Sequence, residues 1–226
     1  MQRFERLLFF LVFMILLSPV CRLGIPHVDN LFRLAFIILL ASVVHRFRIN
    51  QPYPWVYWGL LVPLLVSGLS SWIFPLNSVL ITADFSLFIL FGLYCVYSLF
   101  HYIFDQRLFT DNQMFWGAAC GYVVFGITWG AFYHTLYIFL PQSFTNVSHW
   151  TDFLYFSFVT LTTMGYGDIA PVHPLARMLS IVEAMFGVLY TSLLVAKLVG
   201  LYALHQQPLG SNQYSNEVEE NSRSTV

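Results

Sequence analysis

Residues 162–171 read TTMGYGDIAP. Two glycines flank a tyrosine, two threonines precede them and an aspartate follows, and long apolar runs lie on both sides of the stretch. In a membrane, backbone that is not helical is tolerated only where protein surrounds it or where it lines water. If the chain lies in a bilayer, this stretch is therefore expected to line a path or a cavity.

The composition indicates an integral membrane protein. Of 226 residues, 58% are hydrophobic, 19% are aromatic and only 9% are charged, whereas soluble domains carry about 25% charged residues. The balance of 10 Lys and Arg against 11 Asp and Glu argues against a nucleic-acid partner. The three cysteines lack metal-ligand spacing, and no nucleophile–base pair is recognisable, so we expect neither an enzyme nor a bound cofactor.

Six apolar runs approach or exceed the 20 or so residues that a helix needs to cross a bilayer: 6–23, 30–46, 54–74, 79–101, 114–140 and 175–203. With both termini in the cytoplasm, the inner side holds Arg3, Arg6, Arg46, Arg48, Arg107, Lys197 and Arg223, against Arg22, Arg33 and Arg177 outside. This bias follows the positive-inside rule and places 141–174 outside. The first run also resembles a signal peptide, but Val20 before Cys21 fits the cleavage rule poorly, so we expect an uncleaved helix.

The predicted fold is an all-α transmembrane chain with six spans and a re-entrant helix. We divide it into an accessory N-terminal domain of about four spans at 1–104, a pore domain at 113–204 and a disordered cytoplasmic tail at 205–226. The re-entrant segment, 149–162, would be about 21 Å long as a helix, enough to enter the bilayer without crossing it. Ser148 or Thr151 could cap its start.

The glycine-bearing stretch suits a dehydrated cation. Such an ion needs oxygens in place of its water, and successive main-chain carbonyls supply them only if alternate residues adopt left-handed dihedrals. Gly165 and Gly167 allow this without a Cβ penalty. The Thr163 hydroxyl adds an oxygen at the inner end, and the Tyr166 ring could brace the backbone.

Residues 160–171, TLTTMGYGDIAP, resemble the selectivity filter of potassium channels, whose usual core is Thr-Val-Gly-Tyr-Gly. Met164 stands where valine is usual, at a position that contributes a main-chain carbonyl. Residues 174–202, PLARMLSIVEAMFGVLYTSLLVAKLVGLY, resemble the inner helix of small bacterial channels with two transmembrane helices. The resemblance covers about 114–204, so the chain is similar to such a pore domain with extra N-terminal spans.

The resemblance implies a passive potassium-selective channel. Potassium would be bound by main-chain oxygens of the filter and by the Thr163 hydroxyl; the filter comprises Thr163, Met164, Gly165, Tyr166 and Gly167, with support from Thr162 and Asp168. Because each chain carries one motif and a fourfold ring needs four, a homotetramer is implied. It would lie in the plasma membrane with its filter mouth extracellular. We expect no cofactor, since potassium is the permeant ion, and no small-molecule substrate is identified.

The last apolar run contains two further candidates. By resemblance, Gly187 would be a hinge, with Val188 and Thr191 facing the cavity; alternatively, Gly187 allows close helix packing. Glu183 is a carboxylic acid within a span, which makes it a functional candidate. It is either a structural group bonded behind the re-entrant helix, for example to Ser157 or Thr160, or a proton-linked gate.

Voltage sensing is not expected. Voltage sensors use three or four gating charges per subunit, and the run 79–101 contains no Lys or Arg. Two alternatives to a selective channel stay open. One is a weakly selective cation channel, if Met164 distorts the filter. The other is a non-conducting regulatory subunit with the same pore module.

Overall fold

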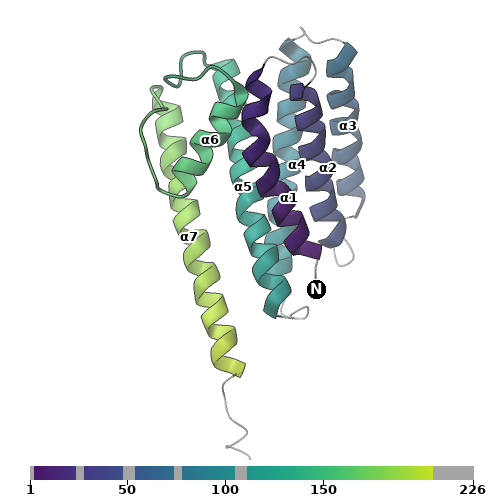
Figure 1. Ribbon diagram of the computed structural model, residues 1–226, viewed down its shortest axis with the longest axis vertical. Helices are drawn as coiled ribbons and strands as arrows, with labels where there is room; N and C mark the ends of the chain where they lie inside the picture. Colours follow the sequence, from purple (N-terminus) through teal and green to yellow (C-terminus); the bar gives the residue numbers. More distant parts are fainter. Residues whose placement is uncertain (1–2, 24–27, 48–53, 74–77, 105–110, 206–226) are drawn as a thin grey trace, which may run out of the picture. The chain divides into compact units, whose positions relative to one another are not determined.

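The computed structural model describes residues 3–23, 28–47, 54–73, 78–104 and 111–205, and its regular elements there are all helices (Figure 1). The predicted all-helical fold class is confirmed. In chain order the helices are α1 Arg3–Leu17, the 3₁₀ helix η1 Ser18–Leu23, α2 Val28–Phe47, α3 Pro54–Ile73, α4 Ser78–Phe104, α5 Asp111–Phe139, α6 Trp150–Leu161 and α7 Pro174–His205. The chain divides into two units, 1–190 and 191–226, which are described separately.

The helices follow the apolar runs of the sequence. Each predicted run coincides with a helix, and α6 occupies 12 residues within the predicted re-entrant segment. Among the described residues, three segments are long and apolar enough to cross a membrane: Glu5–Leu23, Phe115–Phe139 and Pro174–Lys197. The count of six spans and the three domain boundaries stay predictions. Residues 206–226 of the predicted disordered tail lie outside the described residues.

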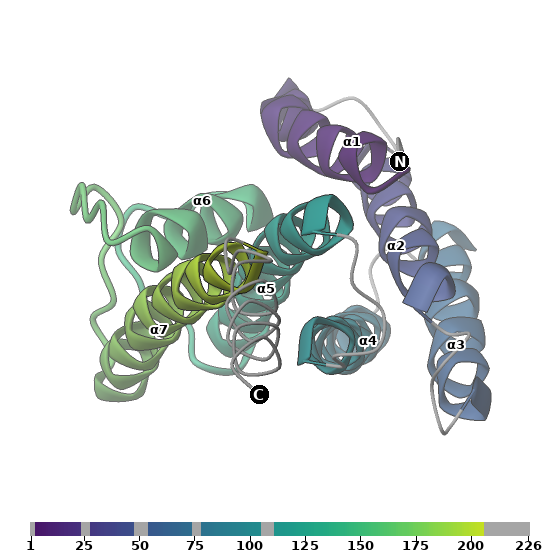
Figure 2. The same cartoon turned by 90° about the horizontal axis from the view of Figure 1, so that it is seen from below.

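Helices α1 to α5 pack side by side within the first unit. Helix α4 packs along α5 and α3, α2 contacts α3 and α4, and α1 contacts α2 and α5. Helix α5 lies between α4 and α6, so it joins the N-terminal helices to the glycine-bearing loop (Figure 2). Each of the five helices contributes a fully buried apolar side chain: Leu11, Leu40, Leu64, Phe91 and Val124.

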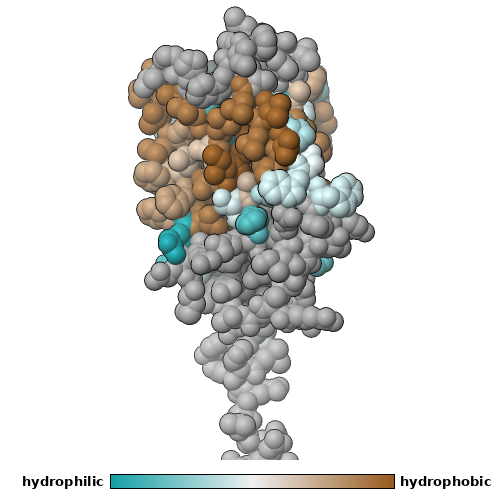
Figure 3. Space-filling view, turned by 90° about the vertical axis from the view of Figure 1, so that its right-hand side faces the viewer, coloured by the Kyte–Doolittle hydropathy of each residue, from teal (hydrophilic) through white to brown (hydrophobic). Residues whose placement is uncertain are grey.

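The outer surface of these helices is also apolar. Along α3, large side chains spaced three or four residues apart are exposed: Trp55, Trp58, Val62, Val66 and Leu69. Figure 3 shows apolar side chains gathered over one face of the described helices. Large exposed apolar patches of this kind mark a contact with lipid or protein, and together with the three long apolar helices they indicate a membrane protein.

Candidate functional site

The site begins at the amino end of α6, where His149 is the N-cap residue. Its ring Nδ1 accepts a hydrogen bond from the Thr151 amide at 3.4 Å. Asp152, three residues on, accepts from the backbone amides of Ser148 and His149 at 2.8 and 3.0 Å, which completes a capping box. The expected caps, Ser148 and Thr151, are therefore wrong. The acid three positions after His149 was the signal in the sequence, although histidine is an uncommon cap.

Helix α6 approaches α5 closely because two glycines of α5 face it. A Cβ added to Gly126 would lie 2.7 Å from the Phe158 ring, and one added to Gly130 would lie 2.9 Å from the Leu154 Cα. A Cβ at either position would require a shift, and at Gly130 the obstacle is backbone. This spacing of small residues is typical of tightly packed membrane helices.

The carboxyl end of α6 is held by contacts from two other helices to the Leu161 carbonyl oxygen. The Tyr122 hydroxyl of α5 donates to this oxygen at 3.1 Å. Gly187 of α7 packs on the same oxygen, since a Cβ there would lie only 2.3 Å from it. The structure thus gives Gly187 a packing role, and the hinge role stays a prediction.

The loop after α6 has an alternating backbone. Thr163, Gly165 and Gly167 adopt positive φ angles of 58°, 59° and 78°. The sequence indicated this conformation for the two glycines but not for Thr163. A positive φ at a β-branched residue is a genuine outlier, and strain of this kind costs about 1–3 kcal/mol and is concentrated at functional sites.

Hydrogen bonds to the last turn of α6 hold the inner end of this loop. The amides of Met164 and Gly165 both donate to the Val159 carbonyl, at 2.9 and 3.4 Å. The Thr163 amide donates to Thr160 at 2.9 Å, and the Thr163 hydroxyl donates to the Thr162 carbonyl at 2.7 Å. The amides therefore face the helix, and the outlier at Thr163 is compensated by two bonds.

Asp168 anchors the outer end of the loop. Its main-chain oxygen accepts from the Asn146 side-chain amide at 2.8 Å. Its carboxyl interacts with the Tyr155 hydroxyl of α6, and this interaction raises the pKa of Tyr155 above its ordinary value. Neither partner was identified from the sequence. The loop is therefore tied to α6 at both ends.

The loop faces away from the body of its own chain. All residues from Thr162 to Asp168 are exposed, including 57% of Met164 and 66% of Tyr166. A Cβ at Gly165 or Gly167 would meet no atom within 4 Å. A strained, tethered loop that contacts so little of its own chain is unusual unless another surface completes it.

Helix α7 contributes a narrow buried stripe to the first unit. Ala176, Glu183 and Gly187 are buried, whereas apolar side chains around them are exposed. The predicted cavity residues Val188 and Thr191 are both exposed.

Glu183 is fully buried against the predicted partner Ser157 and against Tyr133, which the sequence did not indicate. Its two carboxyl oxygens lie 2.5 Å from the Ser157 Oγ and 2.8 Å from the Tyr133 hydroxyl. The other suggested partner, Thr160, instead accepts from Thr163 through its main-chain oxygen.

The N-terminal helices contact α6 at its amino end. The Trp150 indole N–H donates to Asp29 of α2 at 2.9 Å, and the His149 ring lies 3.2 Å from the same carboxylate. Arg22 of η1 forms an ion pair with the capping residue Asp152. No sequence motif indicated these contacts, which join segments more than 100 residues apart.

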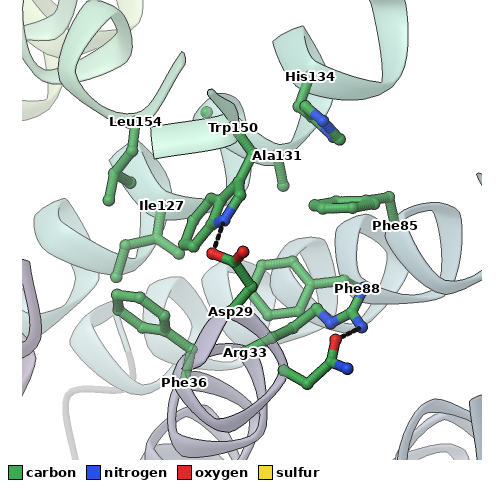
Figure 4. A pocket seen from close by; sticks show the side chains of 12 residues that line it. Asp29, Arg33, Phe36, Phe85, Phe88, Ile127, Ala131, His134, Trp150 and Leu154 are labelled. Carbon is green, nitrogen blue, oxygen red and sulfur yellow. Dashed lines mark hydrogen bonds between the residues drawn. The ribbon is translucent and has the colours of Figure 1, made fainter. Parts of the chain in front are cut away.

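A pocket of about 240 Å³ lies beside these contacts. Figure 4 shows Asp29 and Trp150 at its centre, with aromatic rings around them; among its lining residues are Phe36, Phe85 and Phe88. Arg33, also in the lining, pairs with the buried Asp84 at 2.6 Å and lies over the Phe85 ring. The N-terminal helices thus carry a buried ion pair close to α6.

Part of the site resembles known proteins. Residues 121–203, less than half of the chain, match the family model described as "Ion channel". The chain is 40% identical over 77 residues to "Two pore potassium channel c" of Oryza sativa subsp. japonica, covering 32% of this chain and 17% of that protein. It is 41% identical over 56 residues to "Two-pore potassium channel 5" of Arabidopsis thaliana, covering 25% and 14%. The matched part is thus less than a fifth of either relative, and no solved structure matches significantly.

Proposed function

We propose that this chain is a subunit of a passive potassium-selective channel. The match of residues 121–203 to the "Ion channel" family model supports a channel rather than an enzyme. The permeant ion would lose its water to main-chain oxygens of the loop after α6. Both relatives are named as potassium channels. Those names support potassium as the ion, and the proposal for this chain rests on the geometry of its own loop.

The observation that carries the proposal is the alternation of positive φ at Thr163, Gly165 and Gly167. A dehydrated potassium ion needs a ring of carbonyl oxygens at each step along the pore. Alternating dihedrals allow successive carbonyls to point to one side of the strand. The amides at its inner end are already bonded to α6, so the carbonyls of 163–166 are the oxygens we assign to the ion, with Gly167 and the support of Thr162 and Asp168 completing the filter.

The orientation of α6 adds to this preference. The carboxyl end of a helix carries a partial negative charge of about half an electron. Helix α6 ends at Leu161, directly before the loop. In our proposal the four α6 helices direct this charge toward an ion on the axis, which favours a cation over an anion.

We infer a homotetramer from what the single chain leaves exposed. The loop is exposed throughout, and the apolar side chains Met178, Met185 and Leu189 of α7 are more than half exposed. Four copies around an axis would bring four loops together, as the carbonyl rings require. They would also cover part of α7, leaving lipid to cover the rest.

We further propose six spans per chain in the plasma membrane, with both termini cytoplasmic and the filter mouth extracellular. The charge bias of the sequence supports this orientation. We assign no cofactor; potassium is the ion that passes through the pore. The described helix α4 contains no Lys or Arg, so we propose that this helix does not act as a voltage sensor.

A flux assay in liposomes tests the proposal. Purified protein should admit potassium down its gradient, and barium should block the flux. The Gly165→Ala variant should lose the flux, since alanine at a φ of 59° costs about 1–2 kcal/mol in each of four copies. The control Gly59→Ala, at a helical position with no atom within 4 Å, should conduct normally.

Two results would contradict the proposal in different ways. Tetramers that fold but give no flux would favour the regulatory-subunit alternative. Flux that is equal for potassium and sodium would favour the weakly selective alternative, in which Met164 distorts the filter.

A further inference from the structure

We propose that Glu183 is held as a neutral carboxylic acid and that it positions α6, and through it the filter, by donating its proton to Ser157. The effect on conduction rests on the proposed function. The protonation state and the link between helices do not, because they follow from hydrogen-bond geometry alone.

Four short contacts form an unbroken chain through three helices. The Trp129 indole nitrogen lies 2.7 Å from the Tyr133 hydroxyl, which lies 2.8 Å from Glu183 Oε2. Glu183 Oε1 lies 2.5 Å from Ser157 Oγ, which lies 2.8 Å from the Gly126 carbonyl. All four distances are within hydrogen-bonding range, so each contact requires one proton.

The neighbouring groups supply only three protons to these four contacts. Trp129, Tyr133 and Ser157 each have one donor hydrogen, and a backbone carbonyl has none. Tyr133 can also reach the Ser180 hydroxyl, but at 3.5 Å, and Ser180 already donates to Ala176 at 2.8 Å. The fourth proton must come from Glu183 itself.

A neutral Glu183 assigns every donor once. The indole donates to Tyr133, Tyr133 donates to Glu183 Oε2, Glu183 Oε1 donates to Ser157, and Ser157 donates to Gly126. An ionised Glu183 would compete with Gly126 for the single Ser157 proton, which leaves two oxygens in contact at 2.5 or 2.8 Å without a hydrogen between them.

The surroundings also favour the neutral acid. Glu183 is fully buried. Hydroxyls face its two oxygens, that of Tyr133 from α5 and that of Ser157 from α6. The Tyr122 phenol of α5 is a further titratable group that interacts with Glu183. A buried carboxylate that faces only neutral hydroxyls is unfavourable unless it takes up a proton.

The hydrogen-bonded contacts around Glu183 lie close to the start of the filter. Ser157 lies one helical turn before Leu161 on α6, and Glu183 lies one turn before Gly187 on α7. The Glu183–Ser157 bond is therefore one turn away from the contact of Gly187 with the Leu161 carbonyl. On α5, Gly126 and Tyr122 are related in the same way. Two sets of contacts, one helical turn apart, thus hold α5, α6 and α7 together where the filter begins.

Infrared spectroscopy of the purified protein tests the protonation directly. At neutral pH, the wild-type spectrum minus that of Glu183→Gln should contain a carbonyl band of a protonated carboxylic acid. The Ser157→Ala variant should shift that band, because the acid loses its acceptor. A carboxylate band in the difference spectrum would overturn the proposal. The spectrum does not depend on conduction, so it remains decisive even if the channel function is wrong.

Flux measurements test the positioning role. Glutamine has both an amide donor for Ser157 and an oxygen for Tyr133, so Glu183→Gln should conduct and select like the wild type. Glu183→Ala removes the hydrogen bond to Ser157. It should reduce flux roughly tenfold or more, which is typical when a residue that supports ion-binding groups is lost. Between neutral and acidic pH, wild type and Glu183→Gln should respond alike. Loss of flux or of a pH response in Glu183→Gln alone would overturn the neutral acid and favour a proton-linked gate.

Discussion

Replacement of Gly187 by alanine would test how α7 supports the filter. The new Cβ would lie 2.3 Å from the Leu161 carbonyl oxygen and 3.2 Å from the carbonyl carbon. Both obstacles are backbone atoms, so no side-chain rotation relieves them. Because comfortable contacts of this kind are about 3.5 Å or longer, the helices would have to separate by about 1 Å, or α6 would have to tilt. The same oxygen accepts from Tyr122, so the shift would strain that bond as well.

The expected loss of stability combines two opposing effects. Overpacking of a tight contact costs about 1–3 kcal/mol, while alanine in place of glycine within a helix gains up to about 1 kcal/mol. The net loss is therefore of the order of 1–2 kcal/mol per chain. In a homotetramer this loss is repeated four times, each time at Leu161, the last residue of α6 before the loop.

The matched control is Gly200→Ala, on the same helix at a position with no atom within 4 Å. We expect Gly187→Ala to lower the melting temperature of the purified protein and to reduce potassium selectivity, and the control to do neither. A pure hinge would instead change open probability and leave stability and selectivity intact. If Gly187→Ala proved as stable and as selective as Gly200→Ala, the packing role assigned to Gly187 would be wrong.

Three other predictions concern the filter and its connection to the N-terminal helices. Tyr155→Phe removes the hydroxyl that interacts with Asp168, so currents should decay faster during sustained recording, with folding unchanged by circular dichroism. Trp150→Phe keeps an aromatic ring but removes the indole hydrogen bond to Asp29. Without this bond, amide hydrogen exchange at the start of α6 should become faster. Unchanged exchange would argue against the contact. Conductance should change little with voltage, because the described α4 contains no Lys or Arg, and a steep conductance–voltage curve in planar bilayers would refute this.

The helices and the loop could be predicted because their signals are local. Apolar runs fix where helices lie, and the glycines at 165 and 167 indicate positive φ directly. The positive φ at Thr163 could not be predicted, because threonine avoids that conformation and adopts it here only with two local hydrogen bonds. Its neighbours, not its own preference, determine its backbone.

The contacts between distant segments could not be predicted for a different reason. Asp29 and Trp150 are 121 residues apart, and neither belongs to a recognisable pattern. The environment of Glu183 was predictable in part, since a carboxyl group in an apolar helix needs a polar partner. Ser157 was a natural candidate, but Tyr133 became a partner only through the packing of α5 against α7.

The central claim is that the loop at 163–167 selects potassium by its main-chain oxygens. Bi-ionic reversal potentials of the purified protein in planar bilayers, with potassium on one side and sodium on the other, test it most directly. We expect a reversal potential displaced strongly in the direction set by potassium, and loss of that current in Gly165→Ala. A reversal potential near zero, or the same potential and current in the variant, would contradict it.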